Sequence, residues 1–146
     1  MSNAAARYLL DTNVLSELSR PAPNAAVIAW LRAQPAETLY IASFTMAELW
    51  RGVLELPSGA RRRGLEAWMS GPSGLGAMFA GRTLPFDSAA ALVWARLMAE
   101  GTSRGRPRSD LDMLIVATAE VNGCIVVTAN ERDFSGIPNF NPTVER

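Results

Sequence analysis

Three acidic residues occupy positions from which folding could bring their carboxylates together. Asp11 directly follows a short apolar run, Glu48 lies in the segment TMAELWRG, and Asp112 lies in the segment SDLDMLIVATA. Carboxylates that meet repel one another and raise their own pKa values unless a divalent cation neutralises them. Oxygen ligands of this kind suit Mg²⁺, with Mn²⁺ as a substitute, and such an ion can activate water and orient a phosphodiester. Metal-assisted phosphodiester hydrolysis is therefore the reaction that these residues permit.

The residue types that the chain lacks narrow the chemistry further. None of the 146 residues is a histidine, and all 14 basic residues are arginine. Imidazole acid–base chemistry and lysine Schiff bases are therefore excluded within this chain. The single cysteine, Cys124, excludes an internal disulfide framework and a cysteine-based zinc site. The formal net charge is zero, so composition alone does not indicate nucleic-acid binding, although arginines cluster at 61–63 and 104–108.

The segments that must position the acids alternate between strand-like and helix-like patterns. Apolar runs predict strands over residues 8–10, 38–42 and 124–128. Helical periodicity predicts helices over residues 13–18, 24–34, 45–56, 60–69, 88–100 and 110–121. Asp87 is placed to cap the fifth of these helices, and Gly123 to end the sixth. Residues 70–81 are rich in glycine and predict a loop with at most a short helical turn.

Apolar strands separated by helices predict an α/β fold, a three-layer α/β/α sandwich with a mostly parallel central sheet. The chain length fits one domain over residues 1–146, in which residues 1–6 form a flexible N-terminal extension. Ligands of such sheets collect at the carboxyl ends of the strands. Asp11 and Thr128 each end a strand, so we expect both at that rim. Glu48 and Asp112, near the beginnings of helices, could join them there.

Each acid also has a plain structural explanation. The segment TMAE fits a capping box, SDLD nearly does so, and an acid in the first turn of a helix is favoured by the helix dipole. An Asx-type turn would account for Asp11 or Asn13. Asp110 competes with Asp112 for a place in the site. Only a convergence of all three acids would favour a metal site over these alternatives.

Five segments of the chain, LLDTNVLSEL, TMAELWRG, LPFD, DMLIVATA and VVTANERDF, occur in an order and spacing that resemble the PIN-domain ribonucleases. The similarity is greatest to the VapC/FitB-type toxins of bacterial toxin–antitoxin pairs, and it covers the chain from Tyr8 to its end. It implies a Mg²⁺- or Mn²⁺-dependent endoribonuclease that cuts RNA, is neutralised by a cognate antitoxin protein and commonly forms a homodimer.

The resemblance assigns roles by position. It matches Asp11 to the first metal-binding aspartate of the family, Glu48 to the acid of its AEL motif, and Asp112 to the aspartate before its LIAATA-like helix. Thr12 and Asn13 match the polar residues that support the first acid. The implied site binds the catalytic ion through the two aspartates, with the glutamate acting directly or through water. Without histidine, direct hydrolysis that leaves a 5′-phosphate is expected.

One position departs from the family pattern. Many members carry an aspartate two residues after the threonine that ends the last core strand, here Thr128, but this chain has Asn130 there and Asp133 three residues later. Either residue could take the fourth position of the site. Asparagine brings no charge, which bears on metal affinity and on a second metal ion. The arginine clusters, with Arg51 and Arg132, are candidates to hold RNA phosphates.

Two other classes of protein stay open. A receiver-like phosphoacceptor or a haloacid-dehalogenase-like phosphotransferase also places an aspartate after the first strand, but both usually employ a lysine, which this chain lacks. A catalytically weak or inactive PIN-like module that binds a partner is the stronger alternative, because Asn130 could mark a weakened site. The apolar runs are too short for a membrane helix and no secretion signal is visible, so we expect a cytoplasmic location.

Overall fold

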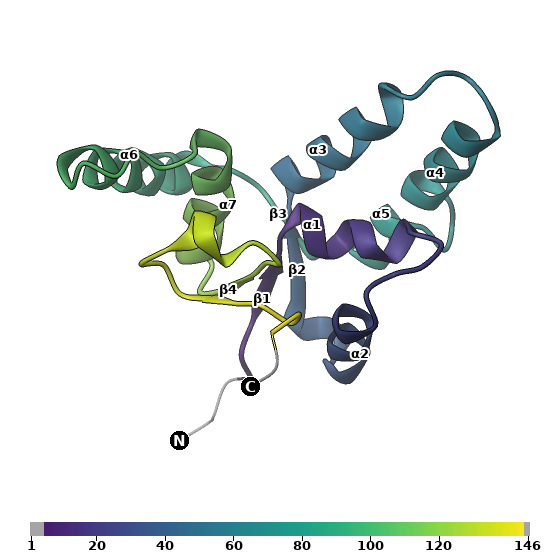
Figure 1. Cartoon of the computed structure of the whole chain (residues 1–146), viewed down its shortest axis with the longest axis horizontal. Coiled ribbons are helices and arrows are strands. Elements are labelled where there is room, and N and C mark those ends of the chain that lie inside the picture. Colours follow the sequence, from purple (N-terminus) through teal and green to yellow (C-terminus); the bar gives the residue numbers. More distant parts are fainter. Residues whose placement is uncertain (1–4, 145–146) are drawn as a thin grey trace.

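The computed structural model describes residues 5–144, so the first four positions of the predicted N-terminal extension lie outside the described residues. The chain forms a five-stranded sheet (Figure 1) made of β1 (Tyr8–Leu10), β2 (Leu39–Ala42), β3 (Thr83–Leu84), β4 (Ile125–Val127) and β5 (Asn139–Phe140). Their order across the sheet is β3-β2-β1-β4-β5, and every neighbouring pair is parallel. The predicted α/β class is confirmed, with a sheet that is wholly parallel.

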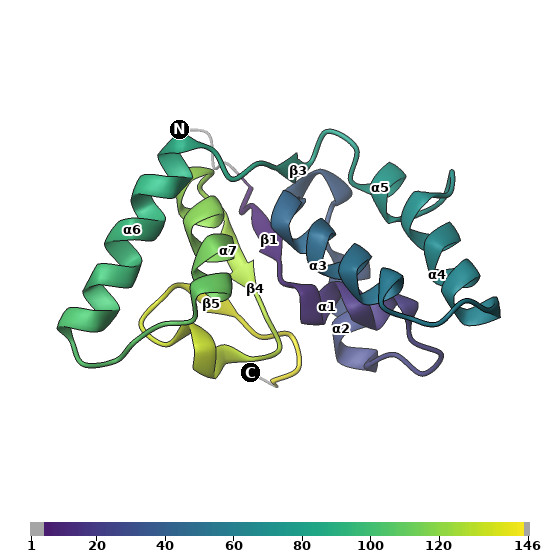
Figure 2. The ribbon, with the colours of Figure 1, turned by 90° about the horizontal axis from the view of Figure 1, so that it is seen from above.

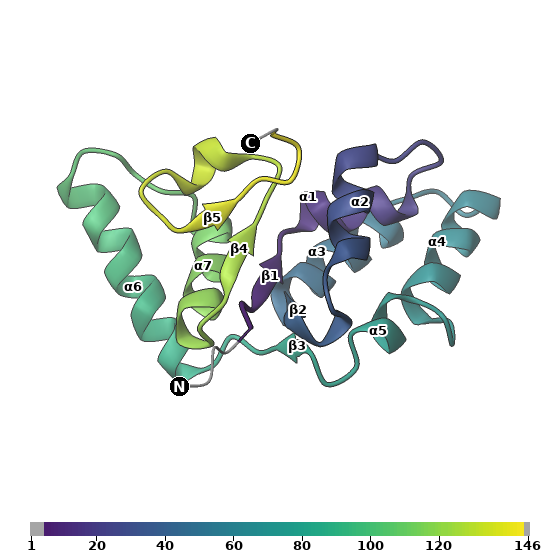
Figure 3. The same cartoon turned by 90° about the horizontal axis from the view of Figure 1, so that it is seen from below.

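Helices cover both faces of this sheet, as predicted for a three-layer sandwich (Figures 2 and 3). One face carries α6 (Ser88–Ser103) and α7 (Asp110–Val121). The other carries α1 (Thr12–Leu15), α2 (Ala25–Ala33), α3 (Ser43–Leu54), α4 (Ala60–Ser70) and α5 (Leu75–Met78). Short 3₁₀ helices lie at η1 (Ser16–Ser19), η2 (Ala36–Thr38) and η3 (Glu131–Phe134). No helix between residues 5 and 144 is long and apolar enough to span a membrane.

The strand residues alternate between two hydrophobic cores, one under each layer of helices. Leu9 and Val126 join the core beneath α6 and α7, whereas their neighbours Leu10 and Val127 join the core beneath the other helices. All four side chains are at most 1% exposed. Successive strand residues point to opposite faces, so a strand covered on both sides needs an apolar residue at every position. This requirement explains the unbroken apolar runs of the sequence.

Most helix ends follow signals that are visible in the sequence. The side chain of Asp87 accepts a hydrogen bond from the Ala90 amide at 2.9 Å and begins α6, as predicted. Gly123 follows α7 with a positive φ of 66°, a conformation that glycine adopts without strain. Helix α3 differs from the prediction, because it begins at Ser43 rather than Thr45 and has no side-chain cap. The helix predicted over residues 13–18 is divided into α1 and η1.

The two edge strands, β3 and β5, were missed by sequence reasoning. Each has only two residues, and neither lies in an apolar run. They exist because a neighbouring strand offers them a partner: Thr83 aligns with Ile41, and Phe140 aligns with Val127. Strands this short depend on tertiary pairing rather than on local propensity.

The central position of β1 determines where a site can form. From β1 the chain moves outward to β2 and β3, then crosses to β4 and β5 on the other side. In a parallel sheet, a change in the direction in which successive strands are added leaves a crevice at that point. The crevice lies at the carboxyl ends of the two strands on either side of the change. Those strands are β1 and β4, which pair along the whole of β1. Asp11 and Thr128 are the residues that follow them, so both stand at this crevice.

The Asp87 cap provides a test of this fold. We expect Asp87→Ala to lower the free energy of unfolding by about 1 kcal/mol, because the Ala90 amide loses its acceptor. Urea unfolding followed by circular dichroism measures the change. Asp87→Asn is the matched control, because asparagine caps about as well as aspartate. An equal loss in both variants would contradict the cap as the stabilising contact.

Candidate active site

Asp11 is held between two strands of the sheet. Its amide donates to the Val127 carbonyl at 2.8 Å, which continues the pairing of β1 with β4. Its carboxylate accepts hydrogen bonds from the Thr12 amide at 2.8 Å and from the Thr128 hydroxyl at 2.9 Å. The residue is 6% exposed. Asp11 is therefore the N-cap residue of α1 and also a buried acid at the predicted rim.

The Thr128 hydroxyl uses its full hydrogen-bonding capacity at this point. It donates to Asp11 and accepts from the Asn13 side-chain amide at 3.3 Å and from the Asn130 main-chain amide at 3.0 Å. The Asn13 side chain also accepts from the Ala129 amide at 3.1 Å. A hydroxyl with one donor and two acceptor positions has no remaining freedom in such an arrangement. Thr128 and Asn13 therefore fix the turn after β4 against Asp11.

Glu48 reaches the same rim from α3. Its carboxylate accepts a hydrogen bond from the Thr12 hydroxyl at 2.8 Å, across 36 positions of sequence. The capping-box explanation for this residue is wrong, because α3 begins at Ser43 and places Glu48 in its second turn. Thr45, the expected cap, is fully buried inside the helix, and its hydroxyl has no hydrogen-bond partner among the described residues. Glu48 is thus tied to the site and not to its own helix end.

Electrostatics connect Asp11 with the other two acids. The pKa of Asp11 is raised from its ordinary 3.8 to about 6, mainly by burial and to a smaller extent by the charges of Asp112 and Glu48. The hydrogen bonds from Thr128 and Thr12 act in the opposite direction because they favour the charged form. The charges of the other two acids therefore reach Asp11, although the three residues come from the end of β1, from α3 and from α7.

Asp112 stands in the first turn of α7 and interacts with a fourth acid. Its amide donates to the hydroxyl of Ser109, the N-cap residue, at 3.2 Å. Burial raises the pKa of the Asp112 carboxyl, and the charge of Asp133 raises it further. Asp133 accepts a hydrogen bond from the side chain of Asn130. Of the two candidates for the fourth position, Asp133 is thus the one whose charge acts on Asp112, and Asn130 holds it.

The atoms that this rim offers as metal ligands are of a type that binds divalent cations. All are oxygens, and none of these acids makes an ion pair with an arginine in the described part of the chain. Over residues 5–144, however, no three acidic or cysteine side chains already form a group that could enclose an ion. Mg²⁺ usually keeps several water ligands and binds through one or two carboxylates, so it does not require such a cage.

The chain is similar to known proteins over most of its length. A family model described as PIN domain matches residues 8–139. The chain belongs to the PIN-domain family. It is 41% identical to the VapC ribonuclease Y4jK of Sinorhizobium fredii over 136 residues, and 36% identical to the toxin FitB of Neisseria gonorrhoeae over 136 residues. Both matches cover 92% of this chain and 96% of the relative.

A solved structure extends the similarity to three dimensions. The crystal structure of FitAcB from Neisseria gonorrhoeae contains a chain that matches with a TM-score of 0.86 and 36% identity, over 92% of this chain and 97% of that chain. The fold of this chain therefore matches that structure over most of its length.

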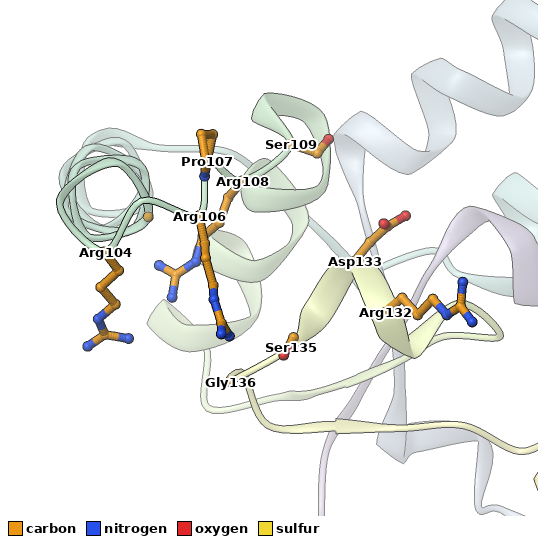
Figure 4. A pocket seen from close by; sticks show the side chains of 10 residues that line it. Arg104, Arg106, Pro107, Arg108, Ser109, Arg132, Asp133, Ser135 and Gly136 are labelled. Atoms are coloured by element: carbon orange, nitrogen blue, oxygen red, sulfur yellow. The ribbon is translucent and has the colours of Figure 1, made fainter.

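The arginines that were candidates for RNA contacts fall into two groups in this PIN domain. Arg51 and Arg62 form ion pairs with glutamates one helical turn away, and Arg108 donates to the Leu97 carbonyl at 2.7 Å. Arg104, Arg106 and Arg132 form no ion pair within residues 5–144. Together with Arg108 they line a cleft that also includes Ser109 and Asp133 (Figure 4). Sequence reasoning missed this cleft, although the turn signal GRP just before the SDLD segment marks one of its walls.

Removal of the Thr128 hydroxyl should weaken the PIN domain at its centre. We expect Thr128→Val to lower the free energy of unfolding by roughly 1–3 kcal/mol, because the Asp11 carboxylate and two amides lose a buried partner. Chemical unfolding at neutral pH measures this. Thr128→Ser keeps the hydroxyl and is the control, with a smaller loss expected. Native stability in Thr128→Val would contradict the role of the hydroxyl.

The raised pKa of Asp11 predicts how stability depends on pH without metal. The folded state holds the proton more tightly than the unfolded chain, so this stabilisation is complete below the ordinary pKa of 3.8 and is lost as pH rises through about 6. Relative to Asp11→Asn, the native protein should therefore lose roughly 3 kcal/mol of unfolding free energy between about pH 4 and pH 8. Urea unfolding in EDTA measures the difference, and a difference that does not change with pH would contradict the shift.

Proposed function

We propose that this PIN-domain protein is a divalent-metal-dependent endoribonuclease that hydrolyses RNA phosphodiester bonds as the toxin of a toxin–antitoxin pair. The observation that carries the proposal is that buried Asp11, at the carboxyl end of the sheet, lies within reach of the charges of both Glu48 and Asp112. Toxin action on cellular RNA fits the cytoplasmic location expected from the sequence. The family match supports treating residues 1–146 as one PIN-like domain.

In this proposal the chain's own residues bind and orient. Asp11 and Asp112 hold Mg²⁺, or Mn²⁺ in its place, and Glu48 contributes directly or through water. When bound, such an ion neutralises the carboxylates, lowers the pKa of water and stabilises the leaving oxygen. Thr12 aims Glu48, and Thr128 with Asn13 aims Asp11, through the hydrogen bonds described above.

Protonation of Asp11 then controls the site. With a pKa of about 6, this carboxyl is mostly ionised at neutral pH and ready to bind a cation. Below that pH it binds a proton instead, so a cation and a proton compete for the same oxygen atoms. The chain has no histidine to supply the paired acid and base for a 2′,3′-cyclic phosphate, which favours products that carry a 5′-phosphate.

The alternative, a PIN-like module that only binds a partner, rests on Asn130. The structure weakens that argument, because Asn130 donates its side-chain amide to Asp133, whose charge acts on Asp112. A fourth carboxylate is therefore present near the site from a position that the family pattern does not anticipate. We propose Asp133 as the residue that takes this role.

The proposed partners follow from the relatives. The VapC ribonuclease and the toxin FitB match nearly the whole of this chain, and we propose that this protein is likewise neutralised by a cognate antitoxin and forms a homodimer. An antitoxin that is co-expressed with the toxin should then protect cells from growth arrest caused by the toxin.

Cleavage of a mixed RNA pool tests the function. We expect the purified protein to cut RNA with Mg²⁺ or Mn²⁺, to lose activity in EDTA, and to lose at least about 100-fold in rate in Asp11→Asn and Asp112→Asn, because each variant removes a charge from the proposed metal site. Mapping of the product ends should find 5′-phosphates.

Asp110→Asn is the matched control for this experiment. Asp110 is exposed in the same first turn of α7 as Asp112, so its variant should cut RNA at the native rate. Thermal unfolding of each variant verifies that it is folded. Cleavage that persists in EDTA or in folded Asp11→Asn would refute the proposed mechanism, and metal binding without any cleavage would favour the partner-binding module.

A further inference from the structure

A cleft with an arginine-rich lining lies beside the acidic rim. We call it the arginine cleft, and its volume is about 340 Å³. Figure 4 shows its two walls, the loop between α6 and α7 on one side and the segment around η3 on the other. Four arginines and a single acid line it, together with small residues: Arg104, Arg106, Arg108, Arg132, Asp133, Gly101, Pro107, Ser109, Ser135 and Gly136.

The loop that carries the arginines is held in place by its own contacts. The Arg106 amide donates to the Gly101 carbonyl at 2.9 Å, and the Arg104 amide donates to the Glu100 carbonyl at 3.1 Å. A Cβ atom at Gly101 would lie 2.9 Å from the Arg106 carbonyl oxygen, so only glycine permits this close approach. The loop therefore presents its side chains from a fixed backbone.

The arginines of this loop differ in whether they already form an ion pair with an acidic residue. Arg108 is largely buried, donates to the Leu97 carbonyl and pairs with Glu100 at 3.5 Å, so it anchors the loop. Arg104 and Arg106 are exposed, and neither forms an ion pair within residues 5–144. Figure 4 shows their two guanidinium groups on the same side of the loop. Two guanidinium groups outside any ion pair of the described residues are thus available to an anion, and the charge of Arg104 also acts on Glu100.

The arginine cleft is continuous with the acidic rim. Ser109 lines the cleft, and its hydroxyl accepts the amide hydrogen bond of Asp112. Asp133 also lines the cleft, and its charge raises the pKa of Asp112. An RNA strand with one phosphate at the carboxylates must place its neighbouring phosphates on adjoining surface, and this cleft is adjoining surface of the opposite charge. The planar guanidinium fork matches a phosphate in shape and hydrogen-bonding pattern.

We propose that the arginine cleft binds the sugar–phosphate backbone of the RNA on one side of the bond that is cut, and that Arg104 and Arg106 are its phosphate-binding residues. The inference rests on the proposed ribonuclease function and adds the surface along which the bound RNA strand extends away from the bond that is cut. Arg108 and Gly101 serve to shape the loop. Because these contacts are to phosphates, they strengthen binding without selecting a base sequence.

Salt-dependent binding tests the cleft. The probe is a short single-stranded RNA bound by folded Asp11→Asn protein, which leaves the RNA intact, and fluorescence anisotropy follows binding from low to high salt. Adding Arg104→Gln with Arg106→Gln should weaken binding for all sequences alike. The slope of log affinity against log salt should fall by about 1.4, which is about 0.7 for each phosphate that the variant no longer neutralises.

Arg20→Gln with Arg32→Gln is the matched control. These two arginines are also exposed, but Arg20 follows η1 and Arg32 lies on α2, on the opposite face of the sheet from α6 and α7. The control should keep the original slope. In cleavage assays without the Asp11 change, the cleft variant should raise KM several-fold and leave kcat nearly unchanged, because its contacts are distant from the reacting atoms.

The possible results distinguish a failure of the cleft proposal from a failure of the proposed function. If the unmodified protein cuts RNA and the cleft variant keeps the original slope and KM, the cleft proposal is wrong and the nuclease stands. If the unmodified protein neither binds nor cuts RNA, the proposed function fails and the cleft proposal with it. If the cleft variant binds RNA normally but escapes neutralisation by the antitoxin, the cleft serves an acidic protein segment, which also overturns the proposal.

Discussion

The buried hydrogen bond from Thr128 to Asp11 is the contact on which the site depends. It joins residues 117 positions apart, and it forms only because β1 and β4 are neighbours in the sheet. A carboxylate that is 6% exposed would be costly to ionise without such donors. The main-chain bond from Asp11 to Val127 fixes the same pair of strands. The position and the orientation of Asp11 thus both follow from the pairing of β1 with β4.

The remaining polar contacts extend this order outward along the rim. Thr12 connects Asp11 to Glu48 on α3, and Asn13 connects α1 to the turn after β4. Each contact crosses between elements, so it joins parts of the rim that are distant in the sequence. A metal-dependent PIN-domain nuclease needs its metal ligands held in position, because the ligands orient the metal and the substrate. Correct orientation of the substrate supplies much of the acceleration of the reaction.

The same placement opposes stability. Burial, with the charges of neighbouring acids, raises the pKa values of Asp11 and Asp112. Their ionisation therefore destabilises the isolated chain at neutral pH, and the two large hydrophobic cores offset this cost. Four of the six ion pairs in the described residues join side chains three or four positions apart, and such local pairs contribute little to that balance. Charge is concentrated instead at the rim, with acids on one side and the unpaired Arg104 and Arg106 on the other. This separation of charge suits a surface that binds a metal ion through its acids and a polyanion through its arginines.

The sequence by itself determined the strands β1, β2 and β4, the helices with clear caps, and the identity of the acids. Those features depend on neighbours within a few positions, through apolar runs, capping side chains and glycine turns. Only the tertiary structure decided that Glu48 bonds to Thr12, that Asp133 approaches Asp112, and that the arginine loop adjoins them. It also decided the edge strands β3 and β5. These contacts depend on which strands lie side by side, and sheet order is not encoded in any local stretch of the chain.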